Sequence, residues 1–368
     1  MYTYMCFKQS ISKYNGGTKM SWQVKAKDVK KLQVEITNYC QARCPECARE
    51  KIFTSGIDNS TPYVFEINNK YVTLEQFKGW VQNDEWSSLQ LIDICGNYDE
   101  PCTNPELIDI VEWILQSKLF DQNLQVNIAT NGGIRDTKFW TELGYITEKY
   151  RNKKGGPRLR VVWGIDGLED TNHLYRRNVK WDKLQENFRA YIRANGNAYW
   201  QFIYFKHNEH QDEQVKERSI KEGFKGVKWR GAKSRPYEET QIEPAQMGKY
   251  EKPNVEASFE VKCKAIARLD YHGLDTGLYI THQGWLLPCC WWGTKSTMKE
   301  VYEKYGHKYD VRSHLLTGSN SIQDALDGEW FSNLHNEIIK DVFAQCSLHC
   351  KENVISTIST EINKNTEK

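Results

Sequence analysis

The chain has 368 residues, and its 50 Lys and Arg residues against 48 Asp and Glu residues leave a formal net charge of +2. This balance argues against a nucleic-acid coat or a membrane-surface protein, and 39% hydrophobic residues argue against a disordered chain. We expect a globular protein of two domains, with no membrane contact and no clear nucleic-acid site.

Cysteine usage and hydropathy restrict the class further. Eleven cysteines are an odd number, so a complete disulfide framework explains them poorly and metal ligation explains them better. Residues 1–20 lack the apolar core of a secretory signal, and no segment reaches the roughly 18 consecutive apolar residues of a membrane span. We therefore expect a cytoplasmic protein.

From residue 32 to residue 233, short apolar runs alternate with amphipathic stretches, as in strand-helix units around a parallel sheet. The predicted strands are Leu32–Thr37, Leu89–Cys95, Leu124–Thr130, Leu159–Ile165, Tyr199–Phe205 and Gly226–Arg230. The predicted helices are Pro105–Ser117, Asp136–Tyr150, Trp181–Ala194 and Glu209–Glu222. Six units are fewer than the eight of a closed barrel, so we expect an α/β fold, a partial (β/α)6 TIM-like barrel with its site at the strand ends.

The predicted boundaries divide the chain into five parts. Residues 1–30 form an N-terminal extension, residues 31–233 the barrel, and residues 234–262 a polar, proline-containing linker. Residues 263–353 form a small C-terminal α+β domain, and residues 354–368 a polar tail. Within the C-terminal domain we expect a hairpin at Gly277–Leu287 that turns at Gln283–Gly284, and a helix at Trp330–Asp341.

Three thiols follow the first predicted strand directly. Cys40, Cys44 and Cys47 have the spacing C-x3-C-x2-C. Iron-sulfur clusters and zinc ions both accept thiolates but usually take four ligands, so a cubane held by three cysteines leaves one iron open to a cofactor or substrate. A zinc site completed by a distant residue is the alternative that the spacing leaves open.

This spacing resembles the motif of the radical S-adenosylmethionine (SAM) superfamily. The resemblance implies that Cys40, Cys44 and Cys47 hold a 4Fe-4S cluster, and that SAM binds at the open iron. It also implies reductive cleavage of SAM to a 5'-deoxyadenosyl radical, with an electron from an external donor such as flavodoxin or ferredoxin. One position departs from the usual pattern, because Glu46 stands where an aromatic residue commonly contacts the adenine.

Polar segments after the next three strands resemble the cofactor motifs of the same superfamily. Residues 96–101 resemble a longer form of the segment whose backbone and acid meet the methionine amino group. Residues 130–132 resemble its threonine-asparagine-glycine turn, and residues 164–167 its serine-x-aspartate-glycine segment, with Gly164 in place of serine. The residues that the resemblance assigns to the cofactor are Gly96, Asn97, Asp99, Glu100, Asn131, Asp166, Arg176 and Arg177. An acidic loop, a common Asn-Gly turn and an exposed arginine are the alternatives.

A second group of cysteines follows the linker. Cys263 and the segment Gly284-x4-Cys289 resemble the opening of the auxiliary-cluster domain, of the twitch or SPASM type, found in many members of the superfamily. The resemblance implies a second 4Fe-4S cluster held by Cys263, Cys289, Cys346 and Cys350. A structural zinc ion held by the same thiols is the alternative, and Cys290 competes with Cys289 as the ligand.

The resemblance implies an oxidoreductase-type radical SAM enzyme that abstracts hydrogen from a small polar molecule or a peptide, for oxidation or cross-linking. Cys95 and Cys290 are candidates for a thiol that returns a hydrogen atom to the substrate, which would make the enzyme a redox-neutral epimerase. A zinc-binding interaction module is the alternative without catalysis. Basic residues at strand ends, Lys206, Arg230 and Lys233, are typical of an anionic substrate group or of solvated charges.

Overall fold

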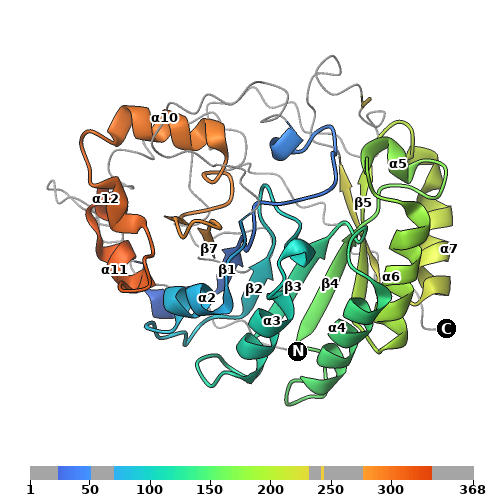
Figure 1. The fold of residues 1–368 in the computed structure, drawn as a ribbon, viewed down its shortest axis with the longest axis horizontal. Coiled ribbons are helices and arrows are strands. Elements are labelled where there is room, and N and C mark those ends of the chain that lie inside the picture. Colours follow the sequence, from blue (N-terminus) through green and yellow to red (C-terminus); the bar gives the residue numbers. More distant parts are fainter. Residues whose placement is uncertain (1–23, 51–69, 232–241, 244–276, 334–368) are drawn as a thin grey trace, which may run out of the picture.

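An eight-stranded sheet forms the centre of the protein, seen in a computed structural model that describes residues 24–50, 70–231, 242–243 and 277–333. The strand order is β6-β5-β4-β3-β2-β1-β7-β8, and all neighbours are parallel except the last pair, β7 and β8 (Figure 1). The strands are β1 (Lys31–Val34), β2 (Leu91–Ile94), β3 (Gln125–Thr130), β4 (Leu159–Gly164), β5 (Ala198–Tyr204), β6 (Val227–Gly231), β7 (Gly277–Ile280) and β8 (Leu286–Leu287).

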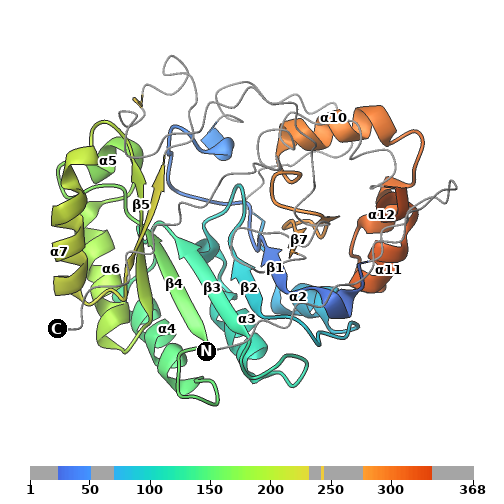
Figure 2. The same cartoon turned by 180° about the vertical axis from the view of Figure 1, so that it is seen from behind.

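The six predicted barrel strands are confirmed, and the fold is a partial TIM-like barrel. Apolar residues on one face of the central strands, such as Ile92 and Ile94 in β2 and Val126 and Ile128 in β3, are fully buried. Figures 1 and 2 show helices along this outer side of the sheet. The first predicted strand is shorter than expected, because the chain leaves the ladder after Val34.

The predicted barrel helices are also confirmed, with α7 preceded by a 3-10 turn. Around the barrel lie α2 (Leu74–Val81), α3 (Leu107–Gln116), α4 (Thr137–Lys149), α5 (Asn172–Tyr175), α6 (Trp181–Arg193) and α7 (Asp212–Glu222). Short 3-10 segments are η1 (Ala26–Asp28), η2 (Pro101–Thr103), η3 (Glu209–Gln211) and η4 (Val311–His314). The Asp136 side chain caps α4 by accepting from Phe139 N at 3.0 Å, and α7 ends at Gly223, whose φ of +89° favours glycine.

The predicted hairpin is confirmed as β7 and β8, with Gly284 at a φ of +88° in its turn. It does not stand apart from the barrel, because β7 pairs in parallel with β1, with Lys31 opposite Gly277. The hairpin therefore extends the barrel sheet. The predicted linker and tail fall almost entirely outside the described residues, as does the predicted helix beyond residue 333.

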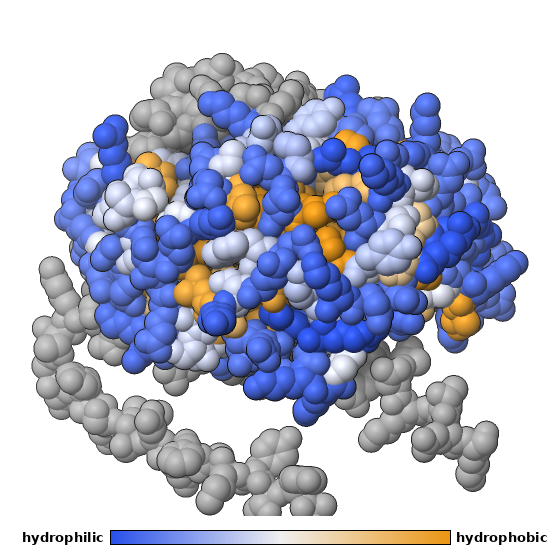
Figure 3. Space-filling model, turned by 60° about the horizontal axis from the view of Figure 1, so that its bottom comes forward, coloured by the Kyte–Doolittle hydropathy of each residue, from blue (hydrophilic) through white to orange (hydrophobic). Residues whose placement is uncertain are grey.

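The C-terminal helices α10 (Lys295–Tyr305), α11 (Ile322–Asp327) and α12 (Glu329–Asn333) lie beyond the β7 side of the sheet, away from α7 (Figures 1 and 2). Asp84, which follows α2, accepts hydrogen bonds from Ile322 N at 2.8 Å and Gln323 N at 2.9 Å. This contact ties the start of α11 to the barrel. In the described ranges, no helix combines the length and the apolar character needed to cross a membrane. On the face drawn in Figure 3, hydrophobic residues form small groups on a mainly hydrophilic surface.

Candidate functional site

The three thiols of the C-x3-C-x2-C segment lie in the loop that follows β1. Cys44 is buried and Cys40 and Cys47 are half-buried, with Cys47 N donating to Cys44 O at 3.0 Å. Burial, then the Glu100 carboxylate and the other two thiols, raises the pKa of Cys40. Burial also raises the pKa of Cys44 to about 11, although Arg176 acts in the opposite direction. The thiols therefore lie close enough to influence one another's ionisation.

The three thiols are spaced too widely for one metal ion but fit a larger metal centre. Within the described residues, no three His, Cys, Asp or Glu side chains are grouped so that they would hold a single metal ion. A four-iron cluster accepts one thiolate at each ligated iron, so its ligands stand farther apart than those of one ion. Three mutually interacting thiols on one short loop fit this second kind of centre.

The end of β3 reaches the thiols through Asn131, whose Nδ2 donates to Cys40 Sγ at 3.6 Å. Gln41 Nε2 donates to Asn131 Oδ1 at 2.7 Å and fixes the orientation of this amide. Glu100 holds the turn that follows β3: its carboxylate accepts from Thr130 Oγ1 and from Asn131 N, each at 2.6 Å. Both Glu100 oxygens thus accept hydrogen bonds from the protein, and Glu100 positions Asn131.

Asp99 differs from its neighbour Glu100, because one of its oxygens is open. Asp99 Oδ1 accepts from Gly96 N at 2.7 Å, while the buried Oδ2 has no hydrogen-bond partner. Burial and the charge of Glu35 raise the pKa of Asp99 well above its ordinary value. Gly96 is needed here, since a Cβ would overlap the Glu35 carboxylate. The neighbouring Asn97 contacts the segment after β8 instead, since its Nδ2 donates to Cys290 O at 2.6 Å.

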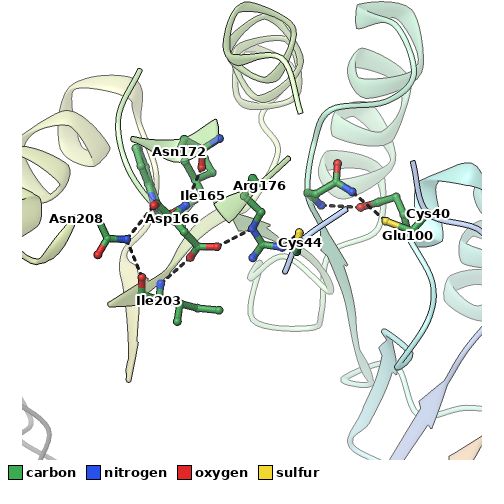
Figure 4. Close-up of polar contacts among 11 residues, drawn as sticks. Cys40, Cys44, Glu100, Ile165, Asp166, Asn172, Arg176, Ile203 and Asn208 are labelled. Carbon is green, nitrogen blue, oxygen red and sulfur yellow. Dashed lines mark hydrogen bonds and ion pairs between the residues drawn. The ribbon is translucent and has the colours of Figure 1, made fainter. Parts of the chain in front are cut away.

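A buried ion pair at the end of β4 contacts the second thiol. Arg176 Nε donates to Asp166 Oδ2 at 2.6 Å, and Ile203 N donates to Asp166 Oδ1 at 2.6 Å. Figure 4 shows Arg176 between this carboxylate and Cys44, and Arg176 Nη1 lies 3.9 Å from Cys44 Sγ. Burial works against the charged guanidinium, but Asp166 and Cys44 raise the pKa of Arg176 overall. Burial raises the pKa of Asp166 in spite of the guanidinium.

Gly164 makes room for this ion pair. A Cβ at Gly164 would lie 2.5 Å from Arg176 Nη2, so a side chain there would displace the guanidinium. The glycine that replaces the expected serine therefore has a steric reason in this chain. The sequence left Arg176 and Arg177 as alternatives, and the structure separates them: Arg177 is exposed, and its carbonyl accepts from Arg43 N at 3.0 Å.

Two buried asparagines hold Asp166 in place, and the sequence predicted neither contact with Asp166. Asn172 Oδ1 accepts from Asp166 N at 2.9 Å, and Asn208 Nδ2 donates at 2.9 Å to both Asp166 O and Ile203 O (Figure 4). The signal in the sequence was a pair of asparagines placed shortly after strands that the analysis had already predicted.

A second buried pair was also missed. His282, after β7, places Nδ1 3.2 Å from Oε2 of Glu35, which directly follows β1. Tyr98 N donates to the other Glu35 oxygen at 2.8 Å. No sequence signal joins Glu35 with His282, because the pair forms only where β7 is added to the sheet beside β1.

Two sets of cysteines remain from the sequence predictions: the candidate hydrogen donors Cys95 and Cys290, and the predicted ligands of the second cluster. Burial, Asp93, Asp99 and Cys290 raise the pKa of Cys95, so the two candidate hydrogen-donor thiols lie near each other. Cys289 is half-buried, and its carbonyl accepts from Trp292 N at 3.2 Å. The other three predicted ligands of the second cluster, Cys263, Cys346 and Cys350, lie outside the described residues, so the second cluster stays a prediction.

The basic residues at strand ends also have different surroundings. Lys206 forms an ion pair with Glu243, whereas Arg230 is exposed at the end of β6. Lys233 lies outside the described residues. The contacts that join Asn131 and Arg176 to the thiols involve neither Lys206 nor Arg230.

Comparison with known proteins adds three structural likenesses. No protein-family model and no curated protein matches the chain. Streptococcus suis SuiB bound to S-adenosylmethionine is similar over 72% of this chain and 61% of its own, with a TM-score of 0.49 and 12% identity. This chain thus spans less than two thirds of SuiB. Native anSMEcpe with bound AdoMet and Cp18Cys peptide is similar over 82% of this chain and 86% of its own, with a TM-score of 0.45 and 13% identity. A third similar structure is that of Kitasatospora setae TsrM. TsrM is a radical S-adenosylmethionine methyltransferase, with cobalamin and a 4Fe-4S cluster bound in that structure. The similarity extends over 57% of this chain and 38% of TsrM, with a TM-score of 0.37 and 10% identity. At these values the likenesses carry no conclusion by themselves, and the interpretation of the site rests on the residues of this chain.

Proposed function

We propose that this chain is a radical SAM enzyme in which Cys40, Cys44 and Cys47 hold a 4Fe-4S cluster. When bound, the cluster would supply the electron that cleaves SAM to a 5'-deoxyadenosyl radical, which takes a hydrogen atom from the substrate. One observation carries the proposal: two donors from different parts of the chain, Asn131 directly after β3 and Arg176 directly after α5, converge on Cys40 and Cys44 at 3.6 and 3.9 Å.

Donors aimed at the thiols are what a cluster site needs. A cysteine ligates metal as the thiolate, and burial of a thiolate is unfavourable without nearby donors or positive charge. The guanidinium of Arg176 lowers the pKa of Cys44 against the effect of burial, and the amide of Asn131 donates to Cys40. Hydrogen bonds to ligating sulfurs also tune the reduction potential of a cluster. A purely structural loop needs neither contact.

The second part of the proposal concerns the cofactor. Asp99 is the acid that we assign to the methionine amino group, because its buried Oδ2 lacks a hydrogen-bond partner, whereas both Glu100 oxygens already accept hydrogen bonds from Thr130 and Asn131. Gly96 and Asn97 supply backbone beside it. Asn131, Asp166 and Arg176 complete the assigned cofactor side, with Glu100 as a positioning residue; Arg177, which is exposed, keeps only the assignment made from the sequence.

For the reaction itself, we propose hydrogen abstraction from a small polar molecule or a peptide, with oxidation or cross-linking as the outcome. The second 4Fe-4S cluster, held by Cys263, Cys289, Cys346 and Cys350 in the C-terminal domain, is part of this proposal. An external one-electron donor such as flavodoxin or ferredoxin would reduce the enzyme.

Redox-neutral epimerisation is the second candidate, and the position of Cys95 favours it. A thiol that donates a hydrogen atom must be protonated. Burial and the negative charges of Asp93 and Asp99 raise the pKa of Cys95, and they keep its thiol in this form. Replacing Cys95 by Ala would then stop product formation but leave SAM cleavage intact, whereas an oxidation would continue in the variant.

The proposal is tested by cofactor cleavage. The full-length chain is reconstituted anaerobically with iron and sulfide, and 5'-deoxyadenosine is measured after addition of SAM and dithionite. Wild type and a Cys6→Ser control are expected to form it, and Cys44→Ser is expected not to. A reconstituted wild type that forms no 5'-deoxyadenosine, or a Cys44→Ser variant that forms it at the wild-type rate, would contradict the proposal.

A further inference from the structure

The concave face of the barrel carries a cluster of charged residues that the proposed function does not use. Lys31 at the start of β1, Arg160 in β4 and Lys228 in β6 are half-buried, and Asp93 in β2 is the acid among them. We call Lys31, Arg160 and Lys228 the cationic floor. Lys31 and Arg160 lie near the starts of their strands, away from the cysteines, which follow the end of β1. Lys228 lies opposite Gln201, which lies opposite Gly164 at the end of β4.

The alternation of each strand places these side chains inside the barrel. Successive side chains of a strand point to opposite faces of the sheet. In β2, Ile92 and Ile94 are buried on the helix-covered side, so Asp93 points to the concave side. The register then aligns Asp93 with Asn127 and Asn127 with Arg160, across three neighbouring strands.

Contacts between the side chains confirm that Lys31, Asp93, Asn127 and Arg160 share this face. Lys31 Nζ lies 3.2 Å from Asp93 Oδ2, and Arg160 Nε donates to Asn127 Oδ1 at 2.8 Å. The Arg160 guanidinium also lies over the Tyr199 ring, 5.3 Å from its centroid. Arg160 is therefore fixed by a neutral amide and a ring, and these contacts leave its positive charge uncompensated.

Lys228 is the third cation of this face, and the positive groups that act on it outnumber the negative one. Burial, followed by the positive charge of Arg160, lowers the pKa of Lys228 to about 8. Arg230 and Lys31 act in the same direction, and Asp93 opposes them.

We propose that the cationic floor binds an anionic group, a carboxylate or a phosphate, of the substrate of this enzyme. That the bound anion belongs to a substrate rests on the proposed function, whereas the anion site itself does not. Half-buried cations without enough matching anions are costly in a folded protein. An anion between Lys31, Arg160 and Lys228 would satisfy these charges, as Lys and Arg commonly do with carboxylates and phosphates.

The distance between the floor and the cysteines restricts the size of this substrate. Along β3, Asn127 stands at the floor and Asn131 contacts Cys40, four residues farther on. At about 3.3 Å per residue, the two levels are about 13 Å apart. A substrate that reacts near the cysteines and contacts Lys31 or Arg160 would therefore extend along the barrel, across a backbone separation of about 13 Å between these two levels. An acidic peptide has this reach.

Anion binding to the reconstituted full-length chain tests the proposal, with inorganic phosphate and succinate as probes in calorimetric titrations at constant ionic strength. We expect saturable binding of one or both probes, and a preference for phosphate or succinate identifies the anion class. Lys228→Met and Arg160→Met should weaken binding at least tenfold, and Lys228→Arg should retain it. Lys221→Met, on the exposed side of α7, is the matched control and should bind as wild type does.

Two results would overturn the proposal: no saturable binding of either probe, or equal affinity in wild type and in a folded Lys228→Met variant. The titration needs neither SAM nor a reductant, so its outcome is independent of cofactor cleavage. Anion binding without 5'-deoxyadenosine formation would refute the proposed function and leave the anion site standing. The reverse result would refute only the anion site.

Discussion

Replacement of Arg176 by Met tests how the buried ion pair holds the site. The variant leaves the Asp166 carboxylate fully buried, with the backbone N–H of Ile203 still donating to it. Removing one partner of a buried pair usually costs about 3–5 kcal/mol, because the other charge stays buried and uncompensated. Since burial already raises the pKa of Asp166, the carboxyl can partly escape this cost by taking up a proton.

Proton uptake by Asp166 makes the predicted loss of stability depend on pH. A carboxyl whose folded pKa lies above its unfolded pKa stabilises the fold at low pH, and that contribution is lost as pH rises through the folded pKa. Loss of Arg176 raises the pKa of Asp166 further. The destabilisation by Arg176→Met should therefore be larger at pH 7 than at pH 5, where more of Asp166 is protonated.

Urea denaturation of the purified full-length variants measures this cost. The double variant Arg176→Met with Asp166→Asn should recover most of the lost stability, because it leaves no unpaired charge. Arg177→Met is the matched control and should change the free energy of unfolding by less than about 0.5 kcal/mol, as exposed substitutions do. The reasoning fails if Arg176→Met costs no more than Arg177→Met, or if the double variant is less stable than Arg176→Met alone.

Three further predictions concern the fold around the site, each measured by the free energy of unfolding. Burial lowers the pKa of His314 to about 4, so its stabilising contribution is present above pH 6.5 and is lost as pH falls toward 4. About 3 kcal/mol is lost over this range, and His314→Phe should remove that pH dependence; an unchanged pH profile would refute the assignment. Gly96→Ala should cost about 1–3 kcal/mol, because the new methyl group overlaps Glu35; a neutral result would mean that this loop has room. Asp84→Ala should cost about 1–2 kcal/mol by removing the acceptor at the start of α11, and Asp84→Asn should recover part of it; equal values for both would argue against the cap.

The parts of the protein that follow from local sequence were predicted. Barrel strands such as β3 are short apolar runs bounded by polar segments, and their buried faces produce that pattern directly. The rule that parallel strand ends share one edge predicted that Asn131 and Asp166 would lie near Cys40 and Cys44. Both groups of residues meet there, through the contacts of Asn131 and Arg176 with the thiols.

The parts that depend on distant partners were not predicted. The hairpin was expected in a separate domain, because nothing in its own residues indicates that β7 pairs with β1. The Glu35–His282 pair depends on that same pairing. The role of Gly164 also stayed hidden, since the absence of a side chain is informative only once Arg176 is seen beside it.

Iron and sulfide content tests the central claim most directly. Wild type and a Cys40→Ala, Cys44→Ala, Cys47→Ala triple variant are reconstituted anaerobically under identical conditions and analysed for iron, acid-labile sulfide and zinc. If these cysteines hold a 4Fe-4S cluster, the triple variant should contain about four fewer irons and four fewer sulfides per chain than wild type, and should no longer form 5'-deoxyadenosine. Equal iron in both proteins, or a wild type that takes up zinc and no iron, would contradict the claim.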